Sequence, residues 1–238
     1  MLSIFPFEPE WYAQHAPKLK VVYVGHPIVD RHLHAPVSTA ESTSAPHVVL
    51  LPGSRTGELK RHLPVVYDAA QLIRARKPGA RFTLVLPDAG LAAQARGAGL
   101  PPFIDLRIGE LSQTLATADL AIASTGTVTL ECAWFRVPTI ALYKTSWSTY
   151  QIAKRIITVK YLAMPNLLAD APVFPEFIQS DADGEKIGAA ASDLLDNRAR
   201  RQQIRGELER IAASLGKPGA VHRAAEAILN LQGHSTLR

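Results

Sequence analysis

The chain has 238 residues, of which 47% are hydrophobic and 20% are charged. These proportions are typical of globular proteins and exclude a disordered, collagen-like or coiled-coil chain. The net charge of +5 suits an anionic ligand or a membrane surface, but it is too small to indicate nucleic acid. At about 150 residues per domain, the length predicts between one and two domains.

The sequence also bears on the compartment. Its single cysteine, Cys132, excludes an intramolecular disulfide framework. No apolar run reaches the roughly 18 residues needed to span a bilayer. The first residues, MLSIFPFEPEWY, lack the basic segment and apolar core of a signal peptide. We therefore expect a cytosolic protein that at most rests on a membrane.

In chain order, a short apolar run at 20–24 is followed by a small, polar and Pro-containing linker at 34–46. Apolar runs of strand length then appear at 47–52, 81–87, 103–106, 119–123 and 138–143. Between them lie segments with helical periodicity, at about 57–76, 89–97, 110–117 and 126–135. This alternation predicts an α/β fold with a Rossmann-like parallel sheet flanked by helices.

From about residue 183 the pattern is helical, with apolar stripes broken by Gly216-Lys217-Pro218-Gly219. The stripes comprise Ile187, Ala191 and Leu194; Ile204, Leu208, Ile211 and Leu215; and Val221, Ala225 and Ile228. We expect three parts: residues 1–45 as a remnant of a preceding domain plus linker, 46–182 as the α/β domain, and 183–238 as C-terminal helices.

The segment VVLLPGSRTGELKRHLP, at 48–64, is the first candidate for chemistry. An apolar strand ends at Pro52, Gly53-Ser54-Arg55 make a tight turn, and a helix follows. Open α/β sheets bind ligands at the carboxyl ends of their strands, and the N–H groups that begin a helix favour phosphate. Arg55 adds a fork-shaped cation. The pattern equally suits an ordinary turn with Ser54 as a cap, since it matches no standard glycine motif.

A second strand-to-helix turn lies in DLAIASTGTVTLE, at 119–131. Thr127 and Glu131 are four residues apart and share one helix face. A hydroxyl near a helix start and a carboxylate one turn later would suit a diphosphate and a ribose, whose hydroxyls a carboxylate accepts. Taken alone, the segment favours a simple helix cap; a second phosphate-type turn on the same sheet favours the ligand interpretation.

Other segments are less specific. Asn166 lies in a loop between Pro165 and two leucines, and Pro175-Glu176 is expected to open another short helix. His32 and His34 lack a third ligand at suitable spacing, so we expect no metal site.

Three further features receive structural interpretations. Cys132 is interpreted as a buried small hydrophobe. Apolar and basic residues interleaved over 144–160 would suit anionic lipid, although core packing with a basic edge is preferred. The run at 198–205 is interpreted as a solvated helix face, and no nucleic-acid partner is expected.

Together, six segments resemble the lipid A disaccharide synthases, which are inverting glycosyltransferases of the GT-B architecture. They are FPFE at 5–8, VGHPIVD at 24–30, LPGSRTGEL at 51–59, STGTVTLE at 124–131, MPNLLA at 164–169 and PEFIQ at 175–179. The resemblance covers nearly the whole chain. GSR and TLE alone would also suit other nucleotide-sugar transferases and UDP-sugar epimerases of the same fold.

The resemblance implies transfer of 2,3-diacylglucosamine from UDP to 2,3-diacylglucosamine 1-phosphate, a lipid-like acceptor, without cofactor or metal and with peripheral contact with the inner membrane. It carries a UDP-sugar-binding role onto Gly53, Ser54, Arg55, Glu58, Thr125, Gly126, Thr127, Glu131, Asn166 and Gln179. The catalytic base is not identified and is expected in a preceding Rossmann-like domain, so this chain alone should be inactive and prone to self-association. The alternatives are a non-catalytic UDP-sugar-binding module, a UDP-N-acetylglucosamine epimerase and a peptidoglycan glycosyltransferase.

Overall fold

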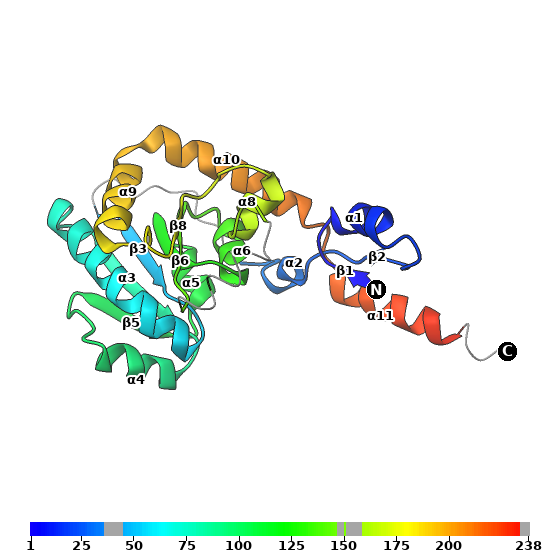
Figure 1. Ribbon diagram of the computed structural model, residues 1–238, viewed down its shortest axis with the longest axis horizontal. Helices are drawn as coiled ribbons and strands as arrows, with labels where there is room; N and C mark the ends of the chain where they lie inside the picture. Colours follow the sequence, from blue (N-terminus) through cyan, green and yellow to red (C-terminus); the bar gives the residue numbers. More distant parts are fainter. Residues whose placement is uncertain (36–44, 147–149, 151–158, 234–238) are drawn as a thin grey trace. The chain divides into compact units, whose positions relative to one another are not determined.

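The computed structural model describes residues 1–35, 45–146, 150 and 159–233 (Figure 1). The chain divides into two compact units. Unit 1 comprises Met1–Ala35 and Arg210–Arg238, and unit 2 comprises Pro36–Glu209. Residues 36–44 of the linker predicted at 34–46 lie outside the described residues, as do residues 147–149 and 151–158 of the interleaved apolar and basic segment at 144–160.

Unit 2 is built on a six-stranded, wholly parallel sheet with the order β5-β4-β3-β6-β7-β8. Its strands are β3 (His47–Leu51), β4 (Arg81–Leu86), β5 (Ile104–Ile108), β6 (Leu120–Ser124), β7 (Thr139–Tyr143) and β8 (Glu176–Ile178). Every residue of β3 and β6 is buried, as expected for central strands covered on both faces. The predicted Rossmann-like parallel sheet is confirmed.

Helices connect these strands and follow the last one. In the described part of unit 2 they are α3 (Thr56–Arg76), α4 (Ala89–Gly97), α5 (Leu111–Leu115), α6 (Thr127–Trp134), α8 (Met164–Ala169), α9 (Gly184–Asp196) and most of α10 (Arg198–Ser214). The predicted α9 and α10 stripes are confirmed, because Ile187, Ala191, Ile204 and Leu208 are fully or almost fully buried.

One expected element is wrong. Pro175-Glu176 does not open a helix: residues Glu176–Ile178 form β8, which pairs in parallel with β7 through Ala141, Leu142 and Tyr143. A proline followed by a glutamate is typical of a helix start, but here the carbonyl of Pro175 accepts a hydrogen bond from the N–H of Ala141, 2.9 Å away. The sheet therefore extends one strand further than predicted.

Helices α3 and α9 pack against each other at backbone distance (Figure 1). A Cβ atom added to Gly184 would lie 2.4 Å from the Cβ of Asp68, and one added to Gly188 would lie 3.1 Å from the carbonyl oxygen of Ala69. The close approach fixes α3, whose amino end follows β3, against the rest of unit 2.

Unit 1 combines the beginning and the end of the chain. It contains β1 (Leu2–Ser3), α1 (Glu8–His15), β2 (Val22–Tyr23), α2 (Pro27–Arg31) and α11 (Ala220–Gly233). The helices predicted as one C-terminal group are thus shared between the two units. The stripe predicted on α11 is exposed, since Val221 and Ile228 remain 64% and 50% accessible.

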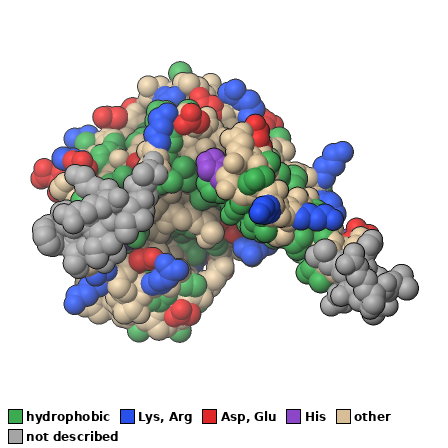
Figure 2. All heavy atoms as spheres, turned by 45° about the vertical axis from the view of Figure 1, so that its right-hand side comes forward, with side chains coloured by type: hydrophobic (Ala, Val, Ile, Leu, Met, Phe, Trp, Pro, Cys, Tyr) green, Lys and Arg blue, Asp and Glu red, His purple; other side chains and the backbone are tan. Residues whose placement is uncertain are grey.

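The helices and the exposed side chains of the described residues bear on whether this part of the chain has a membrane-spanning helix or a charged surface patch. None of its helices has the length and apolar character needed to cross a membrane. On the face drawn in Figure 2, basic and acidic side chains of the described residues are interspersed rather than gathered by sign. Large exposed hydrophobic side chains are concentrated in unit 1, where they include Phe7, Trp11, Leu33 and Leu229.

Candidate functional site

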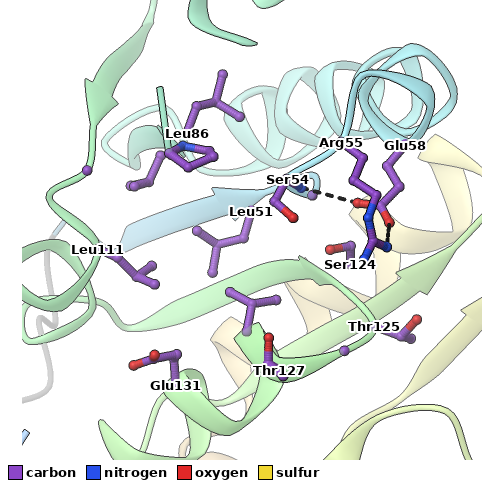
Figure 3. A pocket seen from close by; sticks show the side chains of 16 residues that line it. Leu51, Ser54, Arg55, Glu58, Leu86, Leu111, Ser124, Thr125, Thr127 and Glu131 are labelled. Carbon is purple, nitrogen blue, oxygen red and sulfur yellow. Dashed lines mark hydrogen bonds and ion pairs between the residues drawn. The ribbon is translucent and has the colours of Figure 1, made fainter. Parts of the chain in front are cut away.

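A pocket of about 580 Å³ opens in unit 2 at the carboxyl ends of four strands of the sheet (Figure 3). It lies where β3 pairs with β4 on one side and with β6 on the other, so successive connections leave this point in opposite directions. Such switch points are the usual ligand sites of open α/β sheets. Eight of the ten predicted site residues line the pocket, namely Gly53, Ser54, Arg55, Glu58, Thr125, Gly126, Thr127 and Glu131.

The turn Gly53-Ser54-Arg55, hereafter the GSR turn, connects β3 to α3. Gly53 adopts φ +125°, and a Cβ atom at this position would lie 2.6 Å from Oε2 of Glu58. The turn therefore requires glycine both for its backbone conformation and for space. Helix α3 begins at Thr56, so its first N–H groups and the positive end of its dipole meet the pocket edge.

Glu58 holds the GSR turn together from the first turn of α3. Its Oε2 accepts a hydrogen bond from the N–H of Ser54 at 3.2 Å, and its Oε1 pairs with Nη1 of Arg55 at 3.0 Å (Figure 3). The Arg55 side chain is nevertheless 81% exposed. The guanidinium is therefore attached at one edge while most of its surface is accessible to an anion.

The second turn, Ser124 to Thr127, connects β6 to α6 and faces the GSR turn across the cavity (Figure 3). Gly126 caps α6 at φ +125° and ψ −159°, a conformation that is essentially restricted to glycine. A Cβ atom at Gly126 would meet nothing within 4 Å. Here the backbone alone requires glycine, and the space above it stays open.

Thr127 and Glu131 lie one turn apart on α6, on the side of the cavity opposite the GSR turn (Figure 3). Thr127 is exposed, whereas Glu131 is 92% buried, with only 8% of its surface accessible. The shared helix face predicted from their spacing is thus directed at one pocket, with a hydroxyl near the helix start and a carboxylate deeper along it.

Asn166 is not a pocket residue. It lies on α8, not in a loop, and is completely buried. Its Nδ2 donates to the carbonyl of Phe174 and to Oε1 of Glu176, each at 2.8 Å, and its Oδ1 accepts from the N–H of Phe174 at 2.8 Å. Both amide N–H donors are used within the protein, so in this arrangement they join α8 to β8.

Gln179 also lies apart from the pocket lining. It follows β8 at φ +55°, and its Oε1 accepts a hydrogen bond from the N–H of Thr145 at 2.8 Å. This contact joins the segments that follow β7 and β8 at the carboxyl edge of the sheet. The predicted direct role of Asn166 and Gln179 in binding stays a prediction.

Two groups of residues were not among the predicted site residues. The first completes the pocket wall and comprises Leu51, Val85, Leu86, Pro87, Gly109, Leu111, Ser124 and Val128. Most follow or end strands, so their position was implicit in the predicted sheet. The second is His62, a completely buried residue of α3 that contacts backbone near the GSR turn. Its place in an apolar helical stripe gave no signal of this contact.

One pair relevant to metal binding was also overlooked. Asp181 and Asp183 have the Asp-x-Asp spacing, but Asp183 caps α9 through the N–H groups of Glu185 and Lys186, and Asp181 pairs with Nζ of Lys186 at 2.7 Å. Neither lines the pocket. Among the described residues, no three His, Cys, Asp or Glu side chains gather to hold a metal ion.

Cys132 has the predicted character of a buried hydrophobe. Its side chain is fully buried next to Glu131 on α6. Burial raises the pKa of its thiol to about 12, so the thiolate needed for nucleophilic attack is almost absent at neutral pH.

Comparison with known sequences gives a consistent result. The sequence pattern of the family described as "Lipid-A-disaccharide synthetase" matches residues 1–230. Lipid-A-disaccharide synthase of Anaeromyxobacter sp. (strain K) is 34% identical over 97% of this chain and 62% of its own length. The Chromohalobacter salexigens protein of that name is also 34% identical, over all of this chain and 63% of its own. The chain therefore spans less than two thirds of the length of these relatives.

Solved structures share the fold at low sequence identity. One described as a putative UDP-N-acetylglucosamine 2-epimerase from Listeria monocytogenes matches with a TM-score of 0.56 and 16% identity, over 90% of this chain and 54% of its own. The spinosyn rhamnosyltransferase SpnG, complexed with thymidine diphosphate, matches with a TM-score of 0.57 and 16% identity, over 94% and 56%. These similarities support a GT-B type of fold.

Proposed function

Because the chain belongs to the lipid-A-disaccharide synthetase family, we propose that unit 2 binds the UDP-linked donor sugar of a lipid A disaccharide synthase reaction. The observation that carries this proposal is the convergence of two glycine-containing turns on one pocket at the switch point of the sheet. The GSR turn, Arg55 and the start of α3 would bind the diphosphate. Thr127, at the start of α6, would contact the diphosphate, and Glu131 would bind the ribose.

The proposed chemistry follows from the charge that develops on the leaving group. As the bond between sugar and diphosphate breaks, negative charge grows on UDP. Arg55 and the first N–H groups of α3 would stabilise that charge most where it is greatest, in the transition state. The reaction proposed is transfer of 2,3-diacylglucosamine to 2,3-diacylglucosamine 1-phosphate. Its lipid-like substrates support a cytoplasmic location with peripheral contact with the inner membrane.

Transfer also needs a base for the acceptor hydroxyl and a site that holds the acceptor in line. We do not assign either to the described residues. Loss of such positioning removes about 7–11 kcal/mol of barrier lowering, so donor binding alone does not give turnover. We therefore expect the 238 residues to bind UDP without measurable transfer when assayed alone with donor and acceptor. UDP release proportional to protein and abolished by Arg55→Ala would contradict this.

Titration calorimetry with UDP in excess EDTA tests donor binding directly. Saturable binding is expected without added metal. Absence of binding, or binding that appears only with magnesium, would overturn the proposal. A panel of UDP-sugars with diacylated and unacylated glucosamine separates the lipid A donor from UDP-N-acetylglucosamine, which occurs in the names of two fold relatives.

A further inference from the structure

His62 contacts the backbone behind the GSR turn at two points. Its Nδ1 lies 2.6 Å from the carbonyl oxygen of Pro52, the residue directly before Gly53. Its Nε2 lies 2.9 Å from the backbone nitrogen of Lys144, the first residue after β7. The side chain is completely buried. Two hydrogen bonds thus join α3 to the ends of two different strands.

The two contacted strands are not neighbours. In the sheet, β6 lies between β3 and β7, so no ladder hydrogen bond can join Pro52 to Lys144 directly. His62 bridges them past the carboxyl end of β6, where the second pocket turn begins. The connection continues beyond Lys144, because the next N–H, of Thr145, donates to Oε1 of Gln179.

The shortest contacts favour one state of the ring. The Pro52 carbonyl can only accept, so Nδ1 carries the proton. Nε2 lies 2.9 Å from the Lys144 nitrogen and 3.2 Å from the Lys144 carbonyl oxygen, and in the shorter contact the Lys144 N–H donates to the lone pair of Nε2. Burial lowers the pKa of His62 and favours this neutral form. The titratable groups around it, among the described residues, include Glu58 and Arg61 on α3, Tyr143 at the end of β7 and Lys144 directly after it.

We propose that His62 is a positioning residue for the donor diphosphate, because its bond to Pro52 fixes the GSR turn and its bond to Lys144 fixes that turn relative to β7. The proposal rests on the proposed function, in which the GSR turn binds the diphosphate. His62 itself touches no bound group. It acts through the backbone on the position of Gly53 and Ser54.

Three substitutions separate the two hydrogen bonds. His62→Leu removes both at similar volume. His62→Asn places an amide N–H near the position of Nδ1 and retains only the Pro52 contact, whereas His62→Gln reaches the position of Nε2 and retains only the Lys144 contact. UDP and uridine are titrated into each variant, and thermal unfolding verifies that each is folded.

In His62→Leu, UDP affinity should fall about 5- to 150-fold, since buried polar groups lose their partners at the turn. Uridine lacks the diphosphate, so its affinity should stay within about twofold of the wild-type value, which is the variation expected at a site that the substitution does not affect. His62→Asn should restore UDP binding, and His62→Gln should not. His47→Leu is the matched control, since His47 is also a buried histidine but lies at the opposite, amino end of β3.

The outcomes are distinguishable. No UDP binding by the wild type would overturn the proposed function and this inference with it. Wild-type binding together with unchanged UDP affinity in folded His62→Leu would overturn this inference alone. Equal losses for UDP and uridine, rescue by Gln instead of Asn, or unfolding of all three variants would assign His62 a purely structural role.

Discussion

Two motifs have different roles in the two units, although each combines a glycine, polar side chains and the start of a helix. In unit 1, VGHPIVD at 24–30 uses its polar groups for hydrogen bonds to backbone of the same unit. In unit 2, LPGSRTGEL at 51–59 presents its polar groups to a pocket. Both are among the segments that carry the family resemblance, so membership of a shared motif alone does not distinguish a binding element from a structural one.

In unit 1, the polar groups of the motif hold α11. Oδ1 of Asp30 accepts from the N–H of Gly219 at 2.5 Å, and its Oδ2 accepts from the N–H of Val221 at 3.2 Å, so it caps the helix. Gly25, at φ +85°, leaves room for Arg223, whose Nη2 would lie 2.7 Å from a Cβ atom there. Arg223 in turn donates to the carbonyl of Val24 at 2.9 Å.

The largest effect is expected from Gly53→Ala. The alanine would strain the backbone of the GSR turn and collide with Glu58. If the turn shifts to relieve this strain, the native conformation must be re-formed, at a cost in free energy, when the ligand binds. Strain of about 1–3 kcal/mol and loss of the Ser54 contact should weaken UDP about 10- to 2,000-fold in calorimetry.

Gly126→Ala is its matched control, because the same φ of +125° is strained but the added Cβ meets no atom within 4 Å. It should weaken UDP less than Gly53→Ala does. A larger effect at Gly126 would contradict the role given to Glu58 in closing the GSR turn.

Arg55→Ala should have the next largest effect. A charged hydrogen bond contributes about 1.5–3 kcal/mol, so UDP should bind about 10- to 150-fold more weakly, while uridine affinity should be unchanged. Glu131→Gln should behave differently. Because both ligands contain the ribose, this substitution should weaken the binding of UDP and of uridine to the same extent. Equal losses of UDP and uridine affinity in Arg55→Ala would mean that Arg55 has a structural role, like the polar residues of the unit 1 motif.

Asp30→Ala should disturb only unit 1. Loss of the helix cap should speed amide exchange of Gly219 and Val221 about 2- to 30-fold, as measured by NMR, and leave UDP affinity unchanged. The N–H donors of Gly219 and Val221 lower the pKa of Asp30 below its ordinary 3.8. In the wild type the cap is therefore fully effective above that value and is lost as pH falls through the lower, folded pKa. Protection that disappears already near neutral pH would contradict the assignment.

The smallest effect is expected at Cys132. Because the thiol is buried and its pKa is raised to about 12, the native chain should not react with iodoacetamide at pH 8, whereas the urea-unfolded chain should. Rapid alkylation of the native protein, measured by mass spectrometry, would show that α6 opens toward solvent beside the pocket.

The central strands and both pocket turns were predictable because a fully buried strand has a continuous apolar sequence and a turn after it contains glycine. The edge strand β8 was not, since its three residues are only partly buried and follow a proline that favours a helix start. The contacts of His62 and of Asn166 within the protein were not predicted, for a different reason. The partner of His62, the backbone of Lys144, is distant in sequence. The partner of Asn166, the backbone of Phe174, is near in sequence but is brought into contact by a fold that no local pattern specifies.

The glycine contacts between α9 and α3 restrict how the pocket can adapt. Gly184 leaves no gap for a methyl group against Asp68, and Gly188 leaves only a tight one against Ala69, so α3 cannot slide or tilt against α9 without moving it. Adjustment to a ligand falls to the side chains at the mouth, above all Arg55, which can swing from Glu58 to a phosphate while the peptide dipoles behind it stay aimed at the same point.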